Sequence, residues 1–279
     1  INAFNTNMVA NEAFIDSATL RENVVGLARN IGYVPKSRKA ARAVVSFDAT
    51  FSGTSAQTLT LKSGLVCVGK ISNSSYVYSI PEDITVKTSD SGDQEIASFK
   101  NIEIYEGLLI RNAFSVDTSL DQKFILDNPN IDTSSIRVYV KGENESGLGR
   151  EYKVVDNIID IDGTSEIFLI QEIKDEKYEI IFGDGIFGKK LSNGSVVTVS
   201  YIVTGGEDGN GATNFSFNGI LEYANQEGLL VQPELDETIS VFTLLSSREG
   251  KGIETIDSIK YYAPRAYSAQ NRAVTTRCN

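Results

Sequence analysis

Residues 43–51 read AVVSFDATF, and residues 195–204 read SVVTVSYIVT. In the first stretch, apolar side chains occupy every second position around Phe47. Successive side chains of a β-strand point to opposite faces, so this alternation predicts a strand with one buried face. The second stretch is rich in β-branched residues, which favour the pleated surface of a sheet. The two stretches together predict a protein built mainly from strands.

The same period of two continues between these stretches, interrupted by turn residues such as Ser63-Gly64, Asn128-Pro129 and Asn193-Gly194. Short strands separated by frequent turns are typical of antiparallel sheets arranged as sandwiches or half-open barrels. The strands predicted in this way are 43–51, 57–61, 65–70, 76–80, 84–88, 95–99, 102–110, 121–127, 136–141, 151–161, 166–171, 177–182 and 195–204. A break near 112–120 divides them into β subdomains at 43–115 and 116–204.

The two ends of the chain are predicted to be helical. Leu20, Val24 and Leu27 share a helical face in 20–31, Thr19 and Glu22 match a capping box, and Gly32 favours a helix end. A less regular helix is expected to precede it, through Met8, Val9 and Phe14. The final helix is placed at 252–262, with Pro264 as its stop.

These patterns predict an α+β fold that is mostly β, with a small helical region formed by the two chain ends. Residues 1–42 form the helical N-terminal segment, and residues 205–279 form a loop-rich segment followed by a C-terminal helix. Short helices cannot bury their apolar faces alone, so we expect the 20–31 helix to pack near 253–276.

Composition narrows the function. The chain has 279 residues, of which 41% are hydrophobic and 23% charged, as in soluble folded proteins. Its net charge of −11 argues against nucleic acid as a partner, and no apolar stretch is long enough for a membrane span. The chain contains no histidine, which excludes Ser-His-Asp and Cys-His catalysis and histidine-ligated metals.

The acidic residues are unevenly distributed. Residues 1–42 hold six basic and three acidic residues, and residues 264–279 hold three arginines and no acid. Basic ends and an acidic middle can attract one another within or between copies. Simple solvation of helical ends explains the same pattern.

One motif resembles a nucleotide-binding loop. Residues 183–189, GDGIFGK, match most of a P-loop, but Lys190 stands where a Ser or Thr should hold magnesium. A strand pattern follows, whereas a P-loop runs into a helix. We therefore predict no enzymatic activity, no cofactor, no metal site and no small-molecule substrate.

Three stretches together resemble one family. They are 10–47 (ANEAFIDSATLRENVVGLARNIGYVPKSRKAARAVVSF), 180–210 (IIFGDGIFGKKLSNGSVVTVSYIVTGGEDGN) and 259–276 (IKYYAPRAYSAQNRAVTT). In this order they resemble the baseplate J-like family of contractile phage tails, and the long polar insertions look most like the baseplate wedge protein of T-even phages. The chain starts at Ile1 and ends at Asn279, so we expect a fragment without the family's C-terminal domain.

The resemblance implies a structural subunit of a phage tail baseplate wedge, located in the virion and assembled in the host cytoplasm. It implies contacts with other wedge proteins and with copies of itself, as a homodimer and in a ring that stays connected while the sheath contracts. Two other functions stay open from the residues alone. One is a carbohydrate-binding, adhesin-like tail module, and the other is a carboxylate-based glycoside hydrolase.

Two groups of residues are candidates for subunit contacts. Phe215, Phe217, Leu229 and Leu230 would supply apolar anchors, although the pattern favours ordinary core packing beneath a long loop for any one of them. Arg265, Gln270, Asn271 and Arg272 offer hydrogen-bond donors for a partner. The alternative role of this second group is an internal brace.

Overall fold

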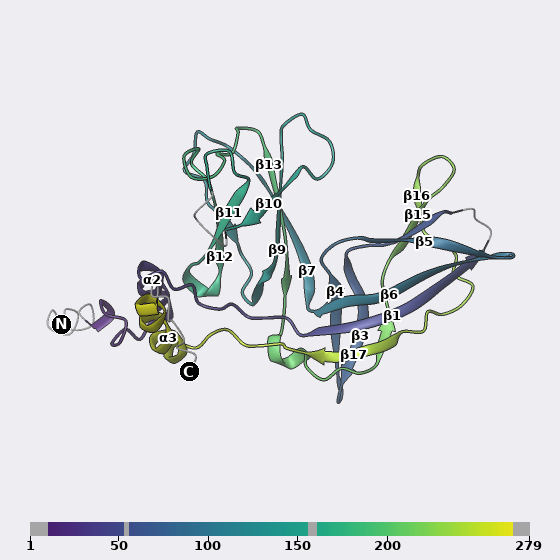
Figure 1. The fold of residues 1–279 in the computed structure, drawn as a ribbon, viewed down its shortest axis with the longest axis horizontal. Helices are drawn as coiled ribbons and strands as arrows, with labels where there is room; N and C mark the ends of the chain where they lie inside the picture. The colour runs from purple at the N-terminus through teal and green to yellow at the C-terminus, as the bar shows by residue number, and fades with distance from the viewer. Residues whose placement is uncertain (1–10, 53–55, 156–160, 270–279) are drawn as a thin grey trace, which may run out of the picture. The chain divides into compact units, whose positions relative to one another are not determined.

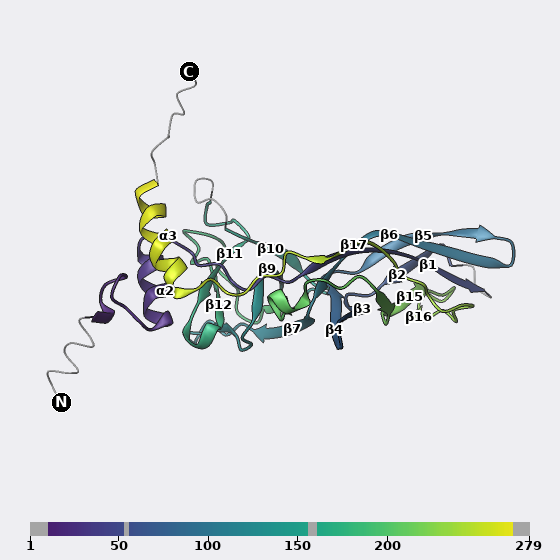
Figure 2. The same cartoon turned by 90° about the horizontal axis from the view of Figure 1, so that it is seen from below.

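The computed structural model describes residues 11–52, 56–155 and 161–269. Its contacts divide the chain into two compact units. The first unit comprises Ile1–Ser37, Glu172–Glu176 and Ile253–Asn279, and the second comprises Arg38–Gln171 and Lys177–Gly252. Figure 1 and Figure 2 show the elements of each unit.

The described strands form two sheets, both mainly antiparallel. The ten-stranded sheet contains β1 (Arg42–Ser52), β2 (Thr58–Leu61), β3 (Gly64–Ile71), β4 (Ser74–Ile80), β5 (Ile84–Ser91), β6 (Gln94–Glu106), β14 (Phe215–Phe217), β15 (Leu221–Ala224), β16 (Leu230–Val231) and β17 (Phe242–Arg248). The seven-stranded sheet contains β7 (Leu108–Ser115), β8 (Phe124–Leu126), β9 (Ile131–Lys141), β10 (Arg150–Val154), β11 (Ile167–Glu172), β12 (Tyr178–Phe182) and β13 (Val196–Val203). The described helices are α2 (Arg21–Asn30), α3 (Ile256–Ala269) and the short 3-10 turns η1 (Lys174–Glu176) and η2 (Gly206–Gly209).

The strand order differs from the chain order in both sheets. In the ten-stranded sheet it is β14-β3-β4-β6-β5-β2-β15-β16, and β1 pairs with both β6 and β17. In the seven-stranded sheet it is β7-β13-β9-β10-β11-β12-β8, in which β10 and β11 are parallel. The late strands β14–β17 therefore return to the sheet that the first strands begin.

The alternation in β1 produces the core of the ten-stranded sheet. Val45, Phe47 and Phe51 are buried on one face of β1, and Phe47 stacks on Phe99 of β6 with ring centroids 4.9 Å apart. Fully burying such a side chain stabilises the fold by about 1.5–3 kcal/mol. Phe215 of β14 joins this core, which explains why the late strands belong to this sheet.

A second core lies within the seven-stranded sheet. β13 is paired with β7 and β9 along most of its length, and it buries Val197, Val199 and Tyr201. β8 and β12 contribute Phe124 and Ile180 to the same cluster. The stretch 195–204 thus forms a strand, as its composition predicted, and the structure places this strand between β7 and β9.

The two chain ends form one helical unit, which confirms the sequence-based prediction. Val24 and Ala28 of α2 pack against Ile259 and Ala263 of α3, and all four are fully buried. Gly32 follows α2 with φ 81°, as expected for a left-handed helix end.

The predicted capping box is wrong. The N-cap of α2 is Leu20, and the backbone N–H and hydroxyl of Thr19 donate to Glu12 Oε1 at 2.8 and 2.7 Å. Asn23 Nδ2 donates to Glu12 Oε2 at 2.7 Å. Hydrogen bonds from Asn23 and Thr19 lower the pKa of Glu12 to about 2. Glu12 thus accepts the backbone N–H of Thr19, which the capping box would have assigned to Glu22.

Several predicted boundaries are also wrong. The strands placed at 95–99 and 102–110 are one strand, β6, followed by β7 after Gly107, because Asn101 adopts φ 56° inside β6 without ending it. The last helix begins at Ile256, not at 252, and it continues past Pro264. Its apolar contact with α2 extends to Ala263, the residue directly before the proline.

Other predictions fall partly outside the described residues. Of the helix expected through Met8, Val9 and Phe14, the first two residues lie outside them and Phe14 lies in a bend. The division into 1–42, 43–115, 116–204 and 205–279 as separate domains stays a prediction.

Candidate interaction site

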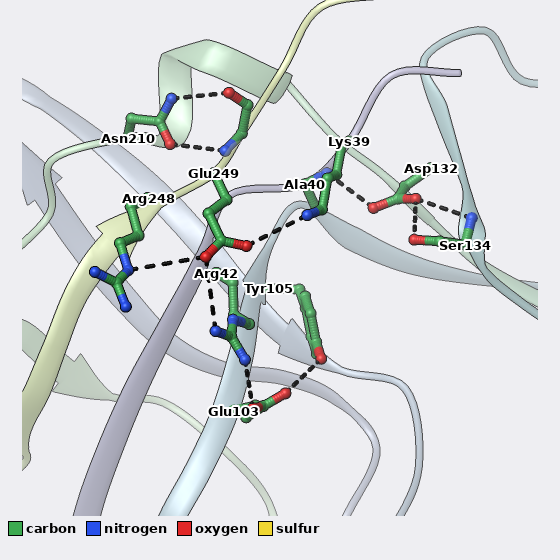
Figure 3. A network of polar contacts seen from close by, with 11 residues as sticks. Lys39, Ala40, Arg42, Glu103, Tyr105, Asp132, Ser134, Asn210, Arg248 and Glu249 are labelled. Atoms are coloured by element: carbon green, nitrogen blue, oxygen red, sulfur yellow. Dashed lines mark hydrogen bonds and ion pairs between the residues drawn. The ribbon is translucent and has the colours of Figure 1, made fainter. Parts of the chain in front are cut away.

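A network of charged residues surrounds the start of β1 (Figure 3). Glu249 is its centre, with carboxylate oxygens 3.3 Å from Lys39 Nζ, 3.8 Å from Arg42 Nη2 and 4.0 Å from Arg248 Nε. Arg42 also pairs with Glu103 at 2.6 Å. The hydrogen bond from Lys39 is the largest cause of a lowered pKa of Glu249. All these side chains are partly exposed, so solvent screens each pair and its contribution to stability is small.

Beside this network lies a buried carboxylate, Asp132 of β9 (Figure 3). Its Oδ2 accepts the backbone N–H of Ala40 at 2.8 Å, and its Oδ1 accepts the backbone N–H and hydroxyl of Ser134. A buried backbone N–H without an acceptor costs about 1–3 kcal/mol. Asp132 therefore fastens the seven-stranded sheet to the segment that enters β1.

Glu106, the last residue of β6, fastens the same two sheets at a second point. Its carboxylate accepts the hydroxyl of Thr204 at 2.5 Å and the backbone N–H of Gly205 at 3.0 Å, directly after β13. Burial raises the pKa of Glu106, and these hydrogen bonds oppose the shift. At Gly107 the chain has φ 123°, and a Cβ there would lie 2.3 Å from the carbonyl oxygen of Val203. Only glycine fits this crossing between the sheets.

In the helical unit, Glu254 collects the hydrogen bonds. It accepts from the Tyr33 hydroxyl at 2.7 Å, from Lys36 N at 2.9 Å and from the Ser258 hydroxyl at 2.8 Å. Burial opposes ionisation of Glu254, but these hydrogen bonds outweigh it and lower the pKa. The sequence contains no local signal for this arrangement, because Tyr33 and Lys36 lie far from Glu254 along the chain.

Arg21 forms a second link in the same unit. Its guanidinium binds both carboxylate oxygens of Glu172, at 2.7 and 3.1 Å, and donates to the carbonyl of Glu254 at 2.5 Å. Bidentate pairs of this kind are among the stronger charged contacts. The short segment at η1 is held to α2 in this way.

The four apolar candidates for a subunit contact differ in burial: the two phenylalanines are buried or partly buried, and the two leucines are exposed. Phe215 is 9% exposed and lies edge-on to Tyr78, with ring centroids 4.9 Å apart. Phe217 is partly buried, 4.9 Å from the ring of Phe47. In contrast, Leu229 and Leu230 are 59% and 65% exposed. The phenylalanines thus lie in the core of the ten-stranded sheet, and the leucines lie on its surface.

Of the four polar candidates for a subunit contact, the structure describes Arg265. Its guanidinium lies over the ring of Tyr261, with Cζ 3.5 Å from the centroid, and Nη1 donates to the Tyr261 carbonyl at 2.5 Å. These contacts lie within α3 and fit the role of a local brace. Gln270, Asn271 and Arg272 lie outside the described residues.

Residues 183–190 form a compact loop between β12 and β13. Asp184 Oδ1 accepts the backbone N–H groups of Ile186 and Phe187, so a side chain occupies the donors that a P-loop would offer to phosphate. Among the described residues, no three Cys, Asp or Glu side chains are grouped closely enough to hold a metal ion. None of the described helices is long and apolar enough to cross a membrane.

The chain is similar to known proteins in two comparisons. Residues 109–212 match the profile of the third domain of bacteriophage baseplate wedge protein gp6, a range that includes most of the seven-stranded sheet. The chain is also 25% identical over 287 residues to baseplate wedge protein gp6 of Enterobacteria phage T4. The chain resembles baseplate wedge proteins. The alignment covers 96% of this chain and 41% of the relative, so the chain spans less than half of that protein's length.

Proposed function

We propose that the chain is part of a structural, non-catalytic subunit of a phage tail baseplate wedge, located in the virion and assembled in the host cytoplasm. The observation that carries this proposal is the similarity to a baseplate wedge protein along 96% of the chain. Membership of the wider baseplate J-like family is a further part of the proposal. It rests on the stretches 10–47, 180–210 and 259–276.

The subunit joins its neighbours into the baseplate ring and keeps contact with them while the sheath contracts. Its partners are other wedge proteins and copies of itself. A subunit in this role must keep its folded structure while the sheath contracts. The buried hydrogen bonds of Asp132 and Glu106 support this role, because the first holds the seven-stranded sheet to the segment before β1 and the second holds β6 to the residue after β13.

The hairpin of β15 and β16 is our candidate for a contact between copies. Asn225 orders its turn by accepting the N–H of Glu227 at 3.0 Å and of Leu229 at 2.9 Å through its side chain. Gly228 completes the turn with φ 78°. Leu229 and Leu230 are thus presented on an ordered turn, which reduces the entropy lost on binding.

Sedimentation velocity over a concentration series tests this contact. We expect the chain to self-associate and the paired change Leu229→Ser with Leu230→Ser to weaken association about tenfold or more, without a change in melting temperature. A contact made by leucines should not weaken when salt is raised. Leu244→Ser, at an exposed residue of β17, is the matched control.

Co-purification tests the wider proposal. The tagged chain, expressed together with the other wedge proteins of the same phage, should retain at least one of them through size-exclusion chromatography. Binding to a glycan array without any retention of wedge proteins would instead support the adhesin-like function.

A further inference from the structure

β17 lies at an open edge of the ten-stranded sheet (Figure 1). Among the described residues it pairs with β1 and with no other strand. On its other side, Gly211 N donates to the carbonyl of Ser247 at 2.8 Å, and Ser247 N donates to the carbonyl of Ala212 at 2.9 Å. In the part of the chain that the structure describes, residues 242–246 therefore have one side without a strand partner. Such a side offers backbone donors and acceptors to another chain.

The same stretch exposes large apolar side chains. Phe242 is 65% exposed and Leu244 is 51% exposed. Leu245 is exposed as well, at the point where the ladder with β1 shifts register on both sides of Val44. Residues 242–247 read FTLLSS and contain no charged residue and no proline, which are common means of preventing a further strand from pairing. The open side thus combines backbone groups with apolar contacts for a partner.

The irregular ladder favours a flexible partner over a second folded copy. Register shifts bend an edge strand and are one of the features that stop two like edges from pairing. A second copy would bring the same irregular edge, so two fixed and bent strands would have to match at once. A flexible segment of another protein has no fixed register and can follow the bend as it orders on binding.

Positive charge is in excess at the C-terminal end of β17. Glu249 is shared there by Lys39, Arg42 and Arg248 (Figure 3). Glu103 balances a second charge of this group through Arg42, at 2.6 Å. Arg248 is exposed, and its ion pair with Glu249 is long, at 4.0 Å. Its guanidinium is therefore accessible to a carboxylate from a partner.

Negative charge gathers before the N-terminal end of β17. Residues 234–237 read ELDE, and all three carboxylates are exposed. Leu235 pairs with Phe51, and Asp236 N donates to the carbonyl of Thr50 at 3.0 Å, so this stretch lies along β1 as β17 does. The open edge is thus acidic at one end, apolar in the middle and basic at the other end.

We propose that β17 is a docking edge for an extended segment of another protein, which adds an antiparallel strand beside residues 242–246. Antiparallel pairing is the more stable arrangement, and it places the first residues of the segment beside Arg248 and its last residues beside 234–237. The segment is therefore acidic at its N-terminal end, apolar at alternate positions in its middle and basic at its C-terminal end. In a baseplate this edge would serve a contact with another wedge protein, and in that respect alone it rests on the proposed function.

A synthetic peptide tests the proposal. The edge follows β1 from Phe51 to Arg42, which is roughly 30 Å at about 3.4 Å per residue, so a peptide of about ten residues spans it. The probe carries aspartates at its N-terminal end, alternating valine and threonine in its middle and lysines at its C-terminal end. Its control has the aspartates and lysines exchanged. Fluorescence anisotropy with the full chain should show about tenfold tighter binding of the probe. N-methylation of the middle amides should abolish binding, because it removes the donors of the added strand.

Variants and hydrogen exchange locate the bound probe. Arg248→Glu should weaken binding about tenfold, whereas Lys153→Glu makes the same charge change at an exposed residue of β10 and should have no comparable effect. Melting temperatures identify a destabilised variant, and Phe242→Thr replaces Arg248→Glu in that case. Amide exchange in 242–246 should slow when the probe is bound, while β7, an edge strand of the other sheet, should exchange as before.

Each remaining outcome decides against the edge or against the function. Equal or tighter binding of the exchanged peptide, unchanged exchange in 242–246, or no binding of the probe would overturn the proposal. A probe that competes with self-association of the chain in sedimentation velocity would assign the edge to a second copy and overturn it too. Retention of a wedge protein in the co-purification without any binding of the probe would refute this edge and leave the proposed function standing. Binding of the probe at β17 without any wedge partner would do the reverse.

Discussion

Replacing Ile259 with alanine should open the helical unit and leave the sheets intact. Ile259 of α3 is fully buried among Val24, Val25 and Ala28 of α2. The change removes every side-chain carbon beyond Cβ, which costs about 2.5 kcal/mol at about 0.8 kcal/mol per buried carbon. The cavity left behind adds to this, so we expect a total of about 3 kcal/mol, within the range of about 2–5 measured for such changes.

Hydrogen exchange followed by mass spectrometry measures this loss locally. A loss of about 3 kcal/mol corresponds to roughly hundredfold faster exchange of the amides protected in α2 and α3. Peptides from β1 and β13 should exchange as in the parent chain. Tyr267→Ala, at an exposed position of α3, should have no comparable effect. Unchanged exchange in α2, or equal acceleration in the sheets, would refute the claim that the two chain ends form a separate core.

Three further predictions concern the hydrogen bonds of the two units. The lowered pKa of Glu254 means that its stabilisation is present above the unfolded value of about 4.5 and is lost as pH falls through the folded value; far-UV circular dichroism at 222 nm should show helix loss on acidification, and Glu254→Gln should flatten this dependence. Asp132→Ala should cost about 1–3 kcal/mol in urea unfolding by leaving Ala40 N without its acceptor, and Asp132→Asn, which keeps an oxygen, should cost less. Gly107→Ala should lower the melting temperature, because its Cβ would collide with the Val203 carbonyl, and a wild-type melting temperature would show that the crossing can relax.

The strands and their buried faces could be predicted because their signal is local. The alternation around Phe47 and the β-branched run at 195–204 each specify a strand without knowledge of the rest of the chain. The helix over 20–31 was predictable for the same reason, since its apolar stripe and Gly32 are both local.

Features set by long-range pairing could not be predicted. The return of β14–β17 to the first sheet depends on partners such as Gly69 for Phe215, which no local pattern names. The hydrogen bonds that Glu254 accepts from Tyr33 depend likewise on where distant segments meet. The cap supplied by Glu12 is nearer in sequence, but it depends on how the chain turns between Glu12 and Thr19. Of the interaction candidates, exposure of Leu229 and burial of Phe215 could not be distinguished, because both are apolar residues beside a turn.

The location of the chain in a virion tests the central claim most directly. Gold-labelled antibodies raised against the chain, applied to intact virions of the phage that encodes it, can be seen by electron microscopy. We predict label at the baseplate of the tail, and no label when the antibodies are first incubated with an excess of the purified chain. Label confined to fibres or to the head, or no label on any virion, would contradict the account.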